Sequence, residues 1–501
     1  MPLATALTLG LLVSAHGVRK WQANALARVL ASGDAAVGAL TCRDDSPTRD
    51  PSDNVLLWER LAYRKSVDRM RLVSTPTPTQ ESAPQLFIDL SETDCSGQDA
   101  PLGTLSIRFC GEADPRAMFR AVVEDRAISI EILQERQGES RVVASSIYPI
   151  VDDRTLAPTI ESALARAELM LSRAIASLAS GDDARVMAPI DMRSEPEPAG
   201  AAWNRKAAKF IIRGVTQRFD RLVGPKDYFL AAVPRKAGFE EDLRRLAERD
   251  DVQITHAPSG YFYADPFPFD HEGEEHLFFE TYDHSINRGR IDWALVRPDG
   301  SLGPVETVLT RPYHLSYPFV FKHAGEIYMI PETAKAGQIE LYQAEEFPRR
   351  WRLVGPMIEN ISANDATLLQ RDGKFWLFAT VAQNGASSWD ELHGFGAPSL
   401  FGPWTPHPQA PLKMDARSAR PAGHFFEEGG KLYRPAQDCS LGYGKGLVIN
   451  EIEVLNAREF RERPVRRFSA DWMPGNFAFH TLNASKRFWW FDGKSRRPLL
   501  P

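Results

Sequence analysis

Two aspartates open corresponding segments of the C-terminal half of the sequence, Asp265 in ADPF and Asp365 in NDAT. Cleavage of a glycosidic bond needs one carboxyl group that protonates the leaving oxygen and another that activates water or attacks the anomeric carbon. Asp265 and Asp365 could form this pair, and Glu332 in MIPET offers a third carboxylate. Aspartates in such short polar runs also cap turns, so a structural role stays open for both.

Further polar residues stand at comparable points of these segments and could bind a substrate. They are Glu280, Tyr317, Arg420, Gln437, Asp438 and His480. Arg420 could clamp a phosphate or carboxylate through two hydrogen bonds, which would suit an anionic sugar or a glycolipid headgroup. Pairing with an aspartate of a neighbouring segment is the alternative for this arginine. Different polar groups at equivalent positions indicate a ligand site.

Five repeated segments carry these residues. They read ADPFPFDHEGEEHLFFE, SYPFVFKHAGEIYMIPE, NDATLLQRDGKFWLFAT, RPAGHFFEEGGKLYRPAQ and FAFHTLNASKRFWWFDG. They start at residues 264, 316, 364, 420 and 477, so successive starts lie 52, 48, 56 and 57 residues apart. Each contains a short apolar strand, a turn that usually has glycine, and a second strand rich in aromatic residues. The repeat length is typical of a propeller blade.

Several repeats continue with two more candidate strands, as in GRIDWALV followed by PVETVL and QIELYQA followed by WRLVGPMI. Four strands a repeat predict a five-bladed β-propeller over residues 228–501, in which the first strand of each blade lines the central channel. A β-sandwich with fortuitous similarity is the alternative. Five matches in register favour the propeller.

Residues 1–183 mix strands such as PQLFIDLS with helices such as TIESALARAELMLSRAIASLA, which predicts a Rossmann-like α/β domain. The apolar start at residues 1–17 reads as a buried first strand or as a secretory signal, and its missing basic segment favours the strand. Residues 184–227 form a linker and a basic amphipathic helix over 204–222. The apolar stripe of that helix could rest on an anionic membrane surface or pack on a neighbouring domain, and we favour packing.

Composition excludes several classes of function. The net charge of -6 provides no positive potential to attract the phosphates of a nucleic acid. No later apolar run is long enough to span a membrane. Four scattered cysteines show neither a disulfide framework nor zinc spacing, which fits a reducing, cytoplasmic location. No nucleotide-binding, metalloprotease or serine-hydrolase motif is present. No cofactor is predicted, although an axial Ca²⁺ stays open.

The segments HLSYPFVF, IYMIPE, IELYQAEEFPRRW, RPAGHFFEEGGKLYRPAQD and YGKG resemble the N-terminal region of plant glucosamine inositolphosphorylceramide transferases and their bacterial relatives. The resemblance covers about residues 228–495 and implies a glycan or glycolipid headgroup as partner. In the plant proteins a glycosyltransferase domain follows this region, whereas this sequence ends at Pro501. The resemblance alone therefore does not imply glycosyl transfer.

More distantly, ADPF and LFGPW resemble five-bladed arabinanase and fructosidase-type glycosidases, which implies that Asp265 is a base or nucleophile. Tyr317 departs from that pattern, because an aspartate would be expected there. The N-terminal domain is similar to a formyltransferase-like domain, with KWQANALARVL as the clearest part. LSIRFCGEADPR stands where the catalytic histidine would lie, so a degenerate scaffold is expected.

The sequence therefore predicts a carbohydrate-active propeller that cleaves or transfers a glycosyl unit. Asp265 is the expected base or nucleophile. Asp365 or Glu332 is expected to be either the acid or a group that modulates the pKa of the reacting carboxyl groups. The alternative is a binding module without catalysis, which would use Arg420, His480 and aromatic side chains. A third hypothesis is a formyl or acyl transferase. The sugar, the linkage and the stereochemical outcome stay open.

Overall fold

The computed structural model describes residues 6–43, 50, 52–75, 82–93, 99–181, 201–216, 226–244 and 246–496. The chain forms two compact units, the first made mainly of residues up to Arg218 and the second mainly of residues from Phe219 onward. Most of the predicted linker, and the end of the predicted basic helix beyond residue 216, lie outside the described residues. Each unit is described separately below.

The N-terminal unit is built on a six-stranded mixed sheet in the order β3-β1-β5-β6-β7-β8. Its strands are β1 (Leu7–Ser14), β3 (Ala35–Arg43), β5 (Leu86–Asp89), β6 (Thr104–Phe109), β7 (Ile128–Arg136) and β8 (Glu139–Tyr148), and a short pair joins β2 (Val18–Arg19) to β4 (Leu72–Val73). The apolar run near the N-terminus forms β1, a buried strand inside the sheet, as favoured from the sequence. Because β7 and β8 run antiparallel to their neighbours, only part of the sheet has the parallel arrangement expected of a Rossmann-like domain.

The helices of this unit are α1 (Lys20–Ser32), α2 (Asp53–Tyr63), α3 (Ala117–Val123), α4 (Leu156–Ser180) and α5 (Ala201–Thr216). The α5 helix contains the described part of the predicted basic amphipathic helix. Its apolar residues Trp203 and Phe210 are buried, and its basic residues Lys206 and Arg213 pair with acidic residues at the end of α3. This face of the helix therefore packs on the protein, but it is not the stripe predicted from the sequence, of which Ala208 and Val215 are exposed and Ile211 is half-buried. None of the helices in the described ranges is long and apolar enough to cross a membrane.

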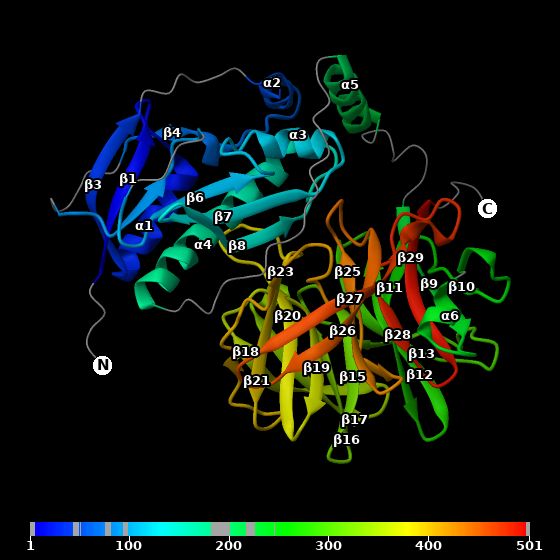
Figure 1. Ribbon diagram of the computed structural model, residues 1–501. Helices are drawn as coiled ribbons and strands as arrows, with labels where there is room; N and C mark the ends of the chain where they lie inside the picture. Colours follow the sequence, from blue (N-terminus) through cyan, green and yellow to red (C-terminus); the bar gives the residue numbers. More distant parts are fainter. Residues whose placement is uncertain are drawn as a thin grey trace. The chain divides into compact units, whose positions relative to one another are not determined.

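The second unit is a five-bladed β-propeller with one four-stranded sheet in each blade, extended by a short extra strand in blade three (Figure 1). Blade one contains β11 (Tyr261–His271), β12 (Glu274–Asp283), β13 (Arg288–Leu295) and β14 (Glu306–Leu309), and blade two β15 (Ser316–His323), β16 (Glu326–Glu332), β17 (Gln338–Glu346) and β18 (Arg350–Glu359). Blade three contains β19 (Ala363–Arg371), β20 (Lys374–Val381), β21 (Glu391–Ala397), β22 (Thr405–Pro406) and β23 (Lys413–Met414), and blade four β24 (Phe426–Glu428), β25 (Lys431–Asp438), β26 (Gly446–Leu455) and β27 (Phe460–Ser469). The predicted propeller is confirmed.

Blade five closes the ring with strands from both ends of the propeller. It contains β28 (Leu482–Ala484), β29 (Phe488–Arg496), β9 (Lys226–Pro234) and β10 (Gln253–Thr255), and a short helix, α6 (Phe239–Arg244), lies between β9 and β10. Figure 1 shows β9 in green beside β29 in red, and their register runs from Lys226 opposite Arg496 to Pro234 opposite Phe488. This pairing joins the two ends of the propeller within one blade and so closes the ring.

Two sequence features explain the blades. The first hairpins of blades one to three turn on two residues with positive φ, the geometry that matches the twist of adjacent strands. The turn residues are Glu272 and Gly273, Ala324 and Gly325, and Asp372 and Gly373. The aromatic second strands fill five hydrophobic clusters among the described residues, one at each blade interface. The blades therefore stabilise one another by burying their faces together.

Candidate active site

Three blades begin with the same unusual backbone conformation. Asp265, Tyr317 and Asp365 have φ of 50°, 47° and 55°, and the pairing register shifts at each of them. A left-handed conformation is uncommon for residues other than glycine, and a bulge re-aims the backbone and side chain of a strand. Here the amide of Tyr317 donates to Asp265 Oδ2 and the amide of Asp265 to Asp492 Oδ2, both at 3.1 Å. The bulges therefore join consecutive blades at their inner ends.

The second strands contribute another set of polar residues at matching positions. Glu280 pairs with Ala264, Glu332 with Ser316, and Thr380 with Asn364, each beside the bulged residue. Gln437 lies next to the last residue of β25 in blade four, and Asp492 lies in the middle of β29 in blade five. Sequence reasoning missed Asp492. Superposing the five repeats would have found it, because its repeat ends in WWFD where blades one and two end in glutamate.

Asp265 lies in a buried cluster with His480 and Asp492. Its Oδ1 accepts a hydrogen bond from the Thr481 hydroxyl at 2.6 Å and lies 3.7 Å from His480 Nε2. His480 Nδ1 lies 2.6 Å from Asp492 Oδ2. Burial opposes protonation of His480, but Asp492 and then Asp265 outweigh it and raise the pKa of this histidine. The imidazolium therefore balances part of the charge of the two aspartates.

Asp365 and Arg420 form a second buried cluster. Arg420 Nε lies 2.7 Å from Asp365 Oδ2, its Nη2 lies 3.5 Å from Glu332 Oε2, and Gln437 Nε2 donates to Asp365 Oδ2 at 3.0 Å. The arginine is 5% exposed and the aspartate 2%. Of the two roles considered for Arg420, the structure shows pairing with the aspartate of a neighbouring blade. The guanidinium group is thereby engaged inside the protein.

Tyr317 and Asp438 differ from the other substrate-binding candidates. Tyr317 is fully buried, and its hydroxyl accepts from the Gly423 amide at 2.6 Å and shares a 2.8 Å hydrogen bond with Thr367. It therefore links blades two, three and four. Asp438 follows Gln437 on β25, so it points to the opposite face, where it accepts from Ser440 Oγ at 2.6 Å. The structure does not bring Asp438 to the clusters described above.

Among the described carboxyl groups at and beside these clusters, Glu280 has the fewest internal partners. It is 6% exposed, and its Oε1 has no hydrogen-bond partner. Burial, followed by the negative charges of Asp265 and Glu332, raises the pKa of Glu280 well above its ordinary value. Burial also raises the pKa of Asp265, but His480 and the Thr481 hydroxyl oppose that rise. The environments of the two carboxyl groups thus differ, because Asp265 has donors at both oxygens and an imidazole nearby whereas Glu280 Oε1 has no hydrogen-bond partner.

A metal ion was considered for the Asp265, His480 and Asp492 cluster, whose ligand atoms all lie within 4.8 Å of one another. Calcium prefers six to eight oxygen ligands. This set supplies an imidazole, and Asp492 already accepts amide hydrogen bonds from His480 and Thr481 at 3.1 Å as well as the contact from His480 Nδ1. The cluster therefore does not fit the Ca²⁺ left open from the sequence.

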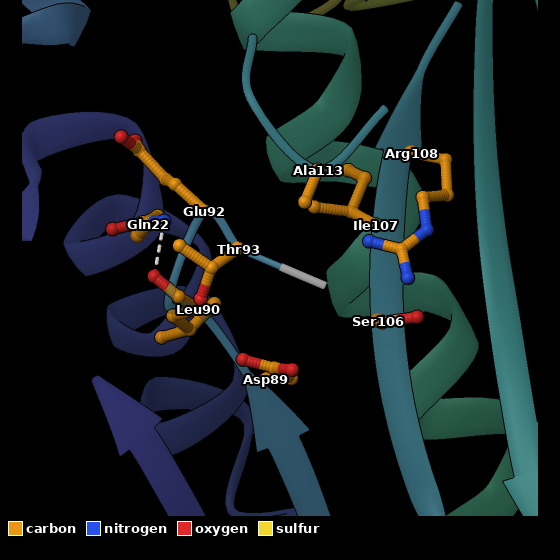
Figure 2. A pocket seen from close by; sticks show the side chains of 9 residues that line it. All are labelled: Gln22, Asp89, Leu90, Glu92, Thr93, Ser106, Ile107, Arg108 and Ala113. Carbon is orange, nitrogen blue, oxygen red and sulfur yellow. Dashed lines mark hydrogen bonds between the residues drawn. The ribbon is translucent and has the colours of Figure 1, made fainter. Parts of the chain in front are cut away.

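The N-terminal unit contains a small polar pocket at the carboxyl ends of β5 and β6 (Figure 2). Asp89 and Ser106 face each other in register across these strands. Gln22 Nε2 donates to the Leu90 carbonyl at 3.0 Å, as Figure 2 shows, and Glu92 is bound in an ion pair at 2.9 Å. With these side chains already bonded, the pocket is of the kind that an ordered water fills. The propeller clusters are the better candidate for chemistry.

Comparison with known proteins identifies relatives of the propeller unit. The family described as "Glucosamine inositolphosphorylceramide transferase 1, N-terminal" matches residues 250–485. The predicted resemblance to this family is confirmed. Glucosamine inositolphosphorylceramide transferase 1 of Oryza sativa subsp. japonica is 39% identical over 218 residues, or 42% of this chain and 29% of that protein. The Arabidopsis thaliana protein of the same name is 37% identical over 205 residues, which cover 40% of this chain and 27% of that protein. The match thus spans less than a third of these relatives.

One similar solved structure is Zg3597, a family 117 glycoside hydrolase from the marine bacterium Zobellia galactanivorans. It is 12% identical with a TM-score of 0.34, and the match covers 46% of this chain and 85% of that chain. The α-L-arabinanase of Cellvibrio cellulosa complexed with arabinohexaose has 14% identity and a TM-score of 0.31, over 40% and 77%. Similarity at this level does not bear on the chemistry. The formyltransferase-like character of the N-terminal unit stays a prediction.

Proposed function

We propose that the propeller binds a glycan or glycolipid headgroup and cleaves or transfers one of its glycosyl units by acid and base catalysis. The proposal rests on one observation above all: Asp265 and Glu280, on paired strands of blade one, differ in their partners, because both oxygens of Asp265 accept hydrogen bonds whereas Glu280 Oε1 has no hydrogen-bond partner. The resemblance to the N-terminal region of glucosamine inositolphosphorylceramide transferases supports a sugar-bearing substrate.

Asp265 is the proposed base or nucleophile. Its two oxygens face hydrogen-bond donors from Thr481 and Tyr317, with His480 at 3.7 Å, and these contacts favour the carboxylate. A carboxylate held in this way can accept a proton from water or attack an anomeric carbon. The bulge at Asp265 fixes the direction of the side chain.

Glu280 is the proposed proton donor, in place of Asp365 or Glu332. A general acid must hold its proton before it reacts, and burial with the nearby charges of Asp265 and Glu332 raises the pKa of Glu280, which favours the protonated form. Burial raises the pKa of Asp365 as well, but Arg420 opposes that rise, and Arg420 and Gln437 engage both oxygens of Asp365. The same arginine lies 3.5 Å from Glu332. We assign to Asp365 and Glu332 the tuning of charge around the reacting pair.

Excess negative charge around the two clusters bears on the type of substrate. Apart from the proposed proton donor Glu280, the charged members are Asp265, Glu332, Asp365, Asp492, Arg420 and His480, so four carboxyl groups accompany two cationic groups. A phosphate or a uronic acid would be repelled there, whereas a neutral or amino sugar would be accepted. We therefore no longer propose that Arg420 clamps an anionic sugar, and we favour a sugar such as the glucosamine in the relatives' name.

A binding module without catalysis is the second candidate, supported by aromatic rings beside the site. The rings of Phe262 and Tyr282 stack with centroids 4.7 Å apart, both are half-buried, and Tyr282 follows Glu280 by two residues on β12. Sugar faces pack well on such rings. Binding without turnover would assign the propeller to this class.

A reducing, cytoplasmic setting is also part of the proposal. Cys42, Cys110 and Cys439 are free thiols, and Cys439 is buried in the propeller. Contact with a membrane through the predicted basic helix is not included, because two of its basic residues, Lys206 and Arg213, are already paired with Glu124 and Asp125.

A screen for turnover and thermal stabilisation tests the proposed function. The purified protein is offered amino-sugar glycosides, neutral glycosides, uronic-acid glycosides and inositol-phosphate glycolipid headgroups. We expect turnover of a neutral or amino-sugar glycoside by the parent protein and none by the Glu280→Gln variant. Stabilisation by a glycoside that neither protein converts would support the binding module instead.

A further inference from the structure

His314 lies beside the proposed acid without belonging to either cluster. Its Nε2 is 3.6 Å from Glu280 Oε1, the oxygen that has no hydrogen-bond partner. This distance is too long for a hydrogen bond. Catalytic hydrogen bonds are often long in the free enzyme and shorten only when substrate is bound. The pair is therefore separated by a distance that a small movement can close.

The structure also defines which nitrogen of His314 faces the acid as a donor. The backbone amide of Gly289 donates to His314 Nδ1 at 2.9 Å, so Nδ1 must be an acceptor without a proton. Burial lowers the pKa of His314, so the ring is neutral at physiological pH and carries its one proton on Nε2. The N–H bond thus faces Glu280.

Gly289 holds the histidine and the acid close together. A Cβ at this position would lie 2.6 Å from Glu280 Oε1 and 2.8 Å from His314 Cε1, so only glycine fits there. The carbonyl of Gly289 also accepts from the Leu315 amide at 3.1 Å, which fixes the chain next to His314. Two hydrogen bonds of Gly289, one to the His314 ring and one to the adjacent Leu315 amide, therefore set the position of the imidazole.

We propose that His314 is a positioning residue for Glu280, an inference that rests on the proposed function. As the proton passes from the Glu280 carboxyl to the leaving oxygen, the His314 Nε2–H closes on Oε1 and stabilises the carboxylate. The histidine donates a hydrogen bond and keeps its proton. Its loss would leave the new charge on Glu280 without a donor.

Other charged groups around His314 and Glu280 also influence the proton affinity of Glu280. Those acting on Glu280 are Asp265, Glu332, Asp492 and Asp365, and those acting on His314 are Glu332, Asp265 and Lys335. The carboxylates all disfavour the ionised form of Glu280. A single donor at Oε1 is therefore expected to have a measurable effect on its proton affinity.

Infrared titration of the free protein tests this inference without requiring a substrate. The carbonyl band of the protonated Glu280 carboxyl is assigned by its disappearance in Glu280→Gln, and its midpoint is followed in His314→Ala and His314→Gln. We expect His314→Ala to raise the midpoint by about one pH unit, a tenfold increase in proton affinity. His314→Gln restores a donor near Nε2 and should recover much of that shift.

His284→Ala is the matched control. It removes a histidine that contacts a different carboxyl group, Asp227 on β9 of blade five, at 3.0 Å. An unchanged midpoint in His314→Ala, or an equal shift in His284→Ala, would overturn the inference. The titration and the turnover screen fail independently. If the midpoint shifts in His314→Ala but the parent protein shows no turnover, the His314 contact is retained and the proposed function is rejected. If turnover is lost in Glu280→Gln but the midpoint does not shift in His314→Ala, the proposed function is retained and the His314 contact is rejected.

Discussion

Replacing Arg420 with methionine should strongly destabilise the propeller. The change removes the cation that lies 2.7 Å from Asp365 and 3.5 Å from Glu332, while both carboxyl groups stay buried. Breaking a buried ion pair from one side costs roughly 3–5 kcal/mol, because the remaining charge has no partner. At about 2–4 °C for each kcal/mol in a domain of this size, the melting temperature should fall by about 10 °C.

Calorimetry and urea unfolding measure this cost. Arg463→Met on the same blade is the control, since its side chain is 53% exposed and its pair with Glu451 should contribute less than about 1 kcal/mol. Adding Asp365→Asn to Arg420→Met removes the unpaired charge, and asparagine tolerates the left-handed backbone at this position, so stability should partly return. Arg420→Met with parental stability would refute the view that this arginine is engaged inside the protein.

Three further predictions follow from the two clusters. Glu280→Gln should lower turnover at least about 100-fold, because it removes the proposed proton donor; an activity assay measures this loss, and unchanged turnover would contradict the assignment. His480 has a raised folded-state pKa, so its contribution to stability is complete below about pH 6.5, the unfolded pKa, and is lost as pH rises through the folded pKa. The unfolding free energy should fall over that window by up to about 1.4 kcal/mol per pH unit, and an equally steep fall in His480→Gln would argue against this origin. Treatment with a chelator should leave the melting temperature unchanged, because the donors of Asp265, His480 and Asp492 are bonded to one another and to the backbone; a large drop would indicate a structural metal ion.

The repeats made the propeller predictable, because each blade encodes its own hairpin in sequence. Turn glycines such as Gly273 and Gly325, with aromatic strands after them, are local signals. The closing pair of β9 and β29 was not predicted, since its partners lie more than 250 residues apart and no local pattern links them. The mixed order of the N-terminal sheet likewise depends on long-range pairing that residue patterns do not contain.

The candidate site was only partly accessible to sequence reasoning. Asp265, Asp365, Arg420 and His480 could be placed near one another because they begin their repeats. The sequence could not show that Arg420 is bound to Asp365, nor that Glu280 lacks a partner, because both depend on side-chain geometry between strands. His314 lies outside the repeated hairpins and had no signal of its own.

The most direct test of the central claim is the turnover rate of Asp265→Asn on the first glycoside that the parent protein converts. Asparagine keeps the size of the side chain and the bulge while removing the carboxylate, and thermal unfolding confirms that the variant is folded. We predict a loss of at least about 100-fold in turnover. Parental turnover in a folded Asp265→Asn protein would contradict the assignment of catalysis to this site.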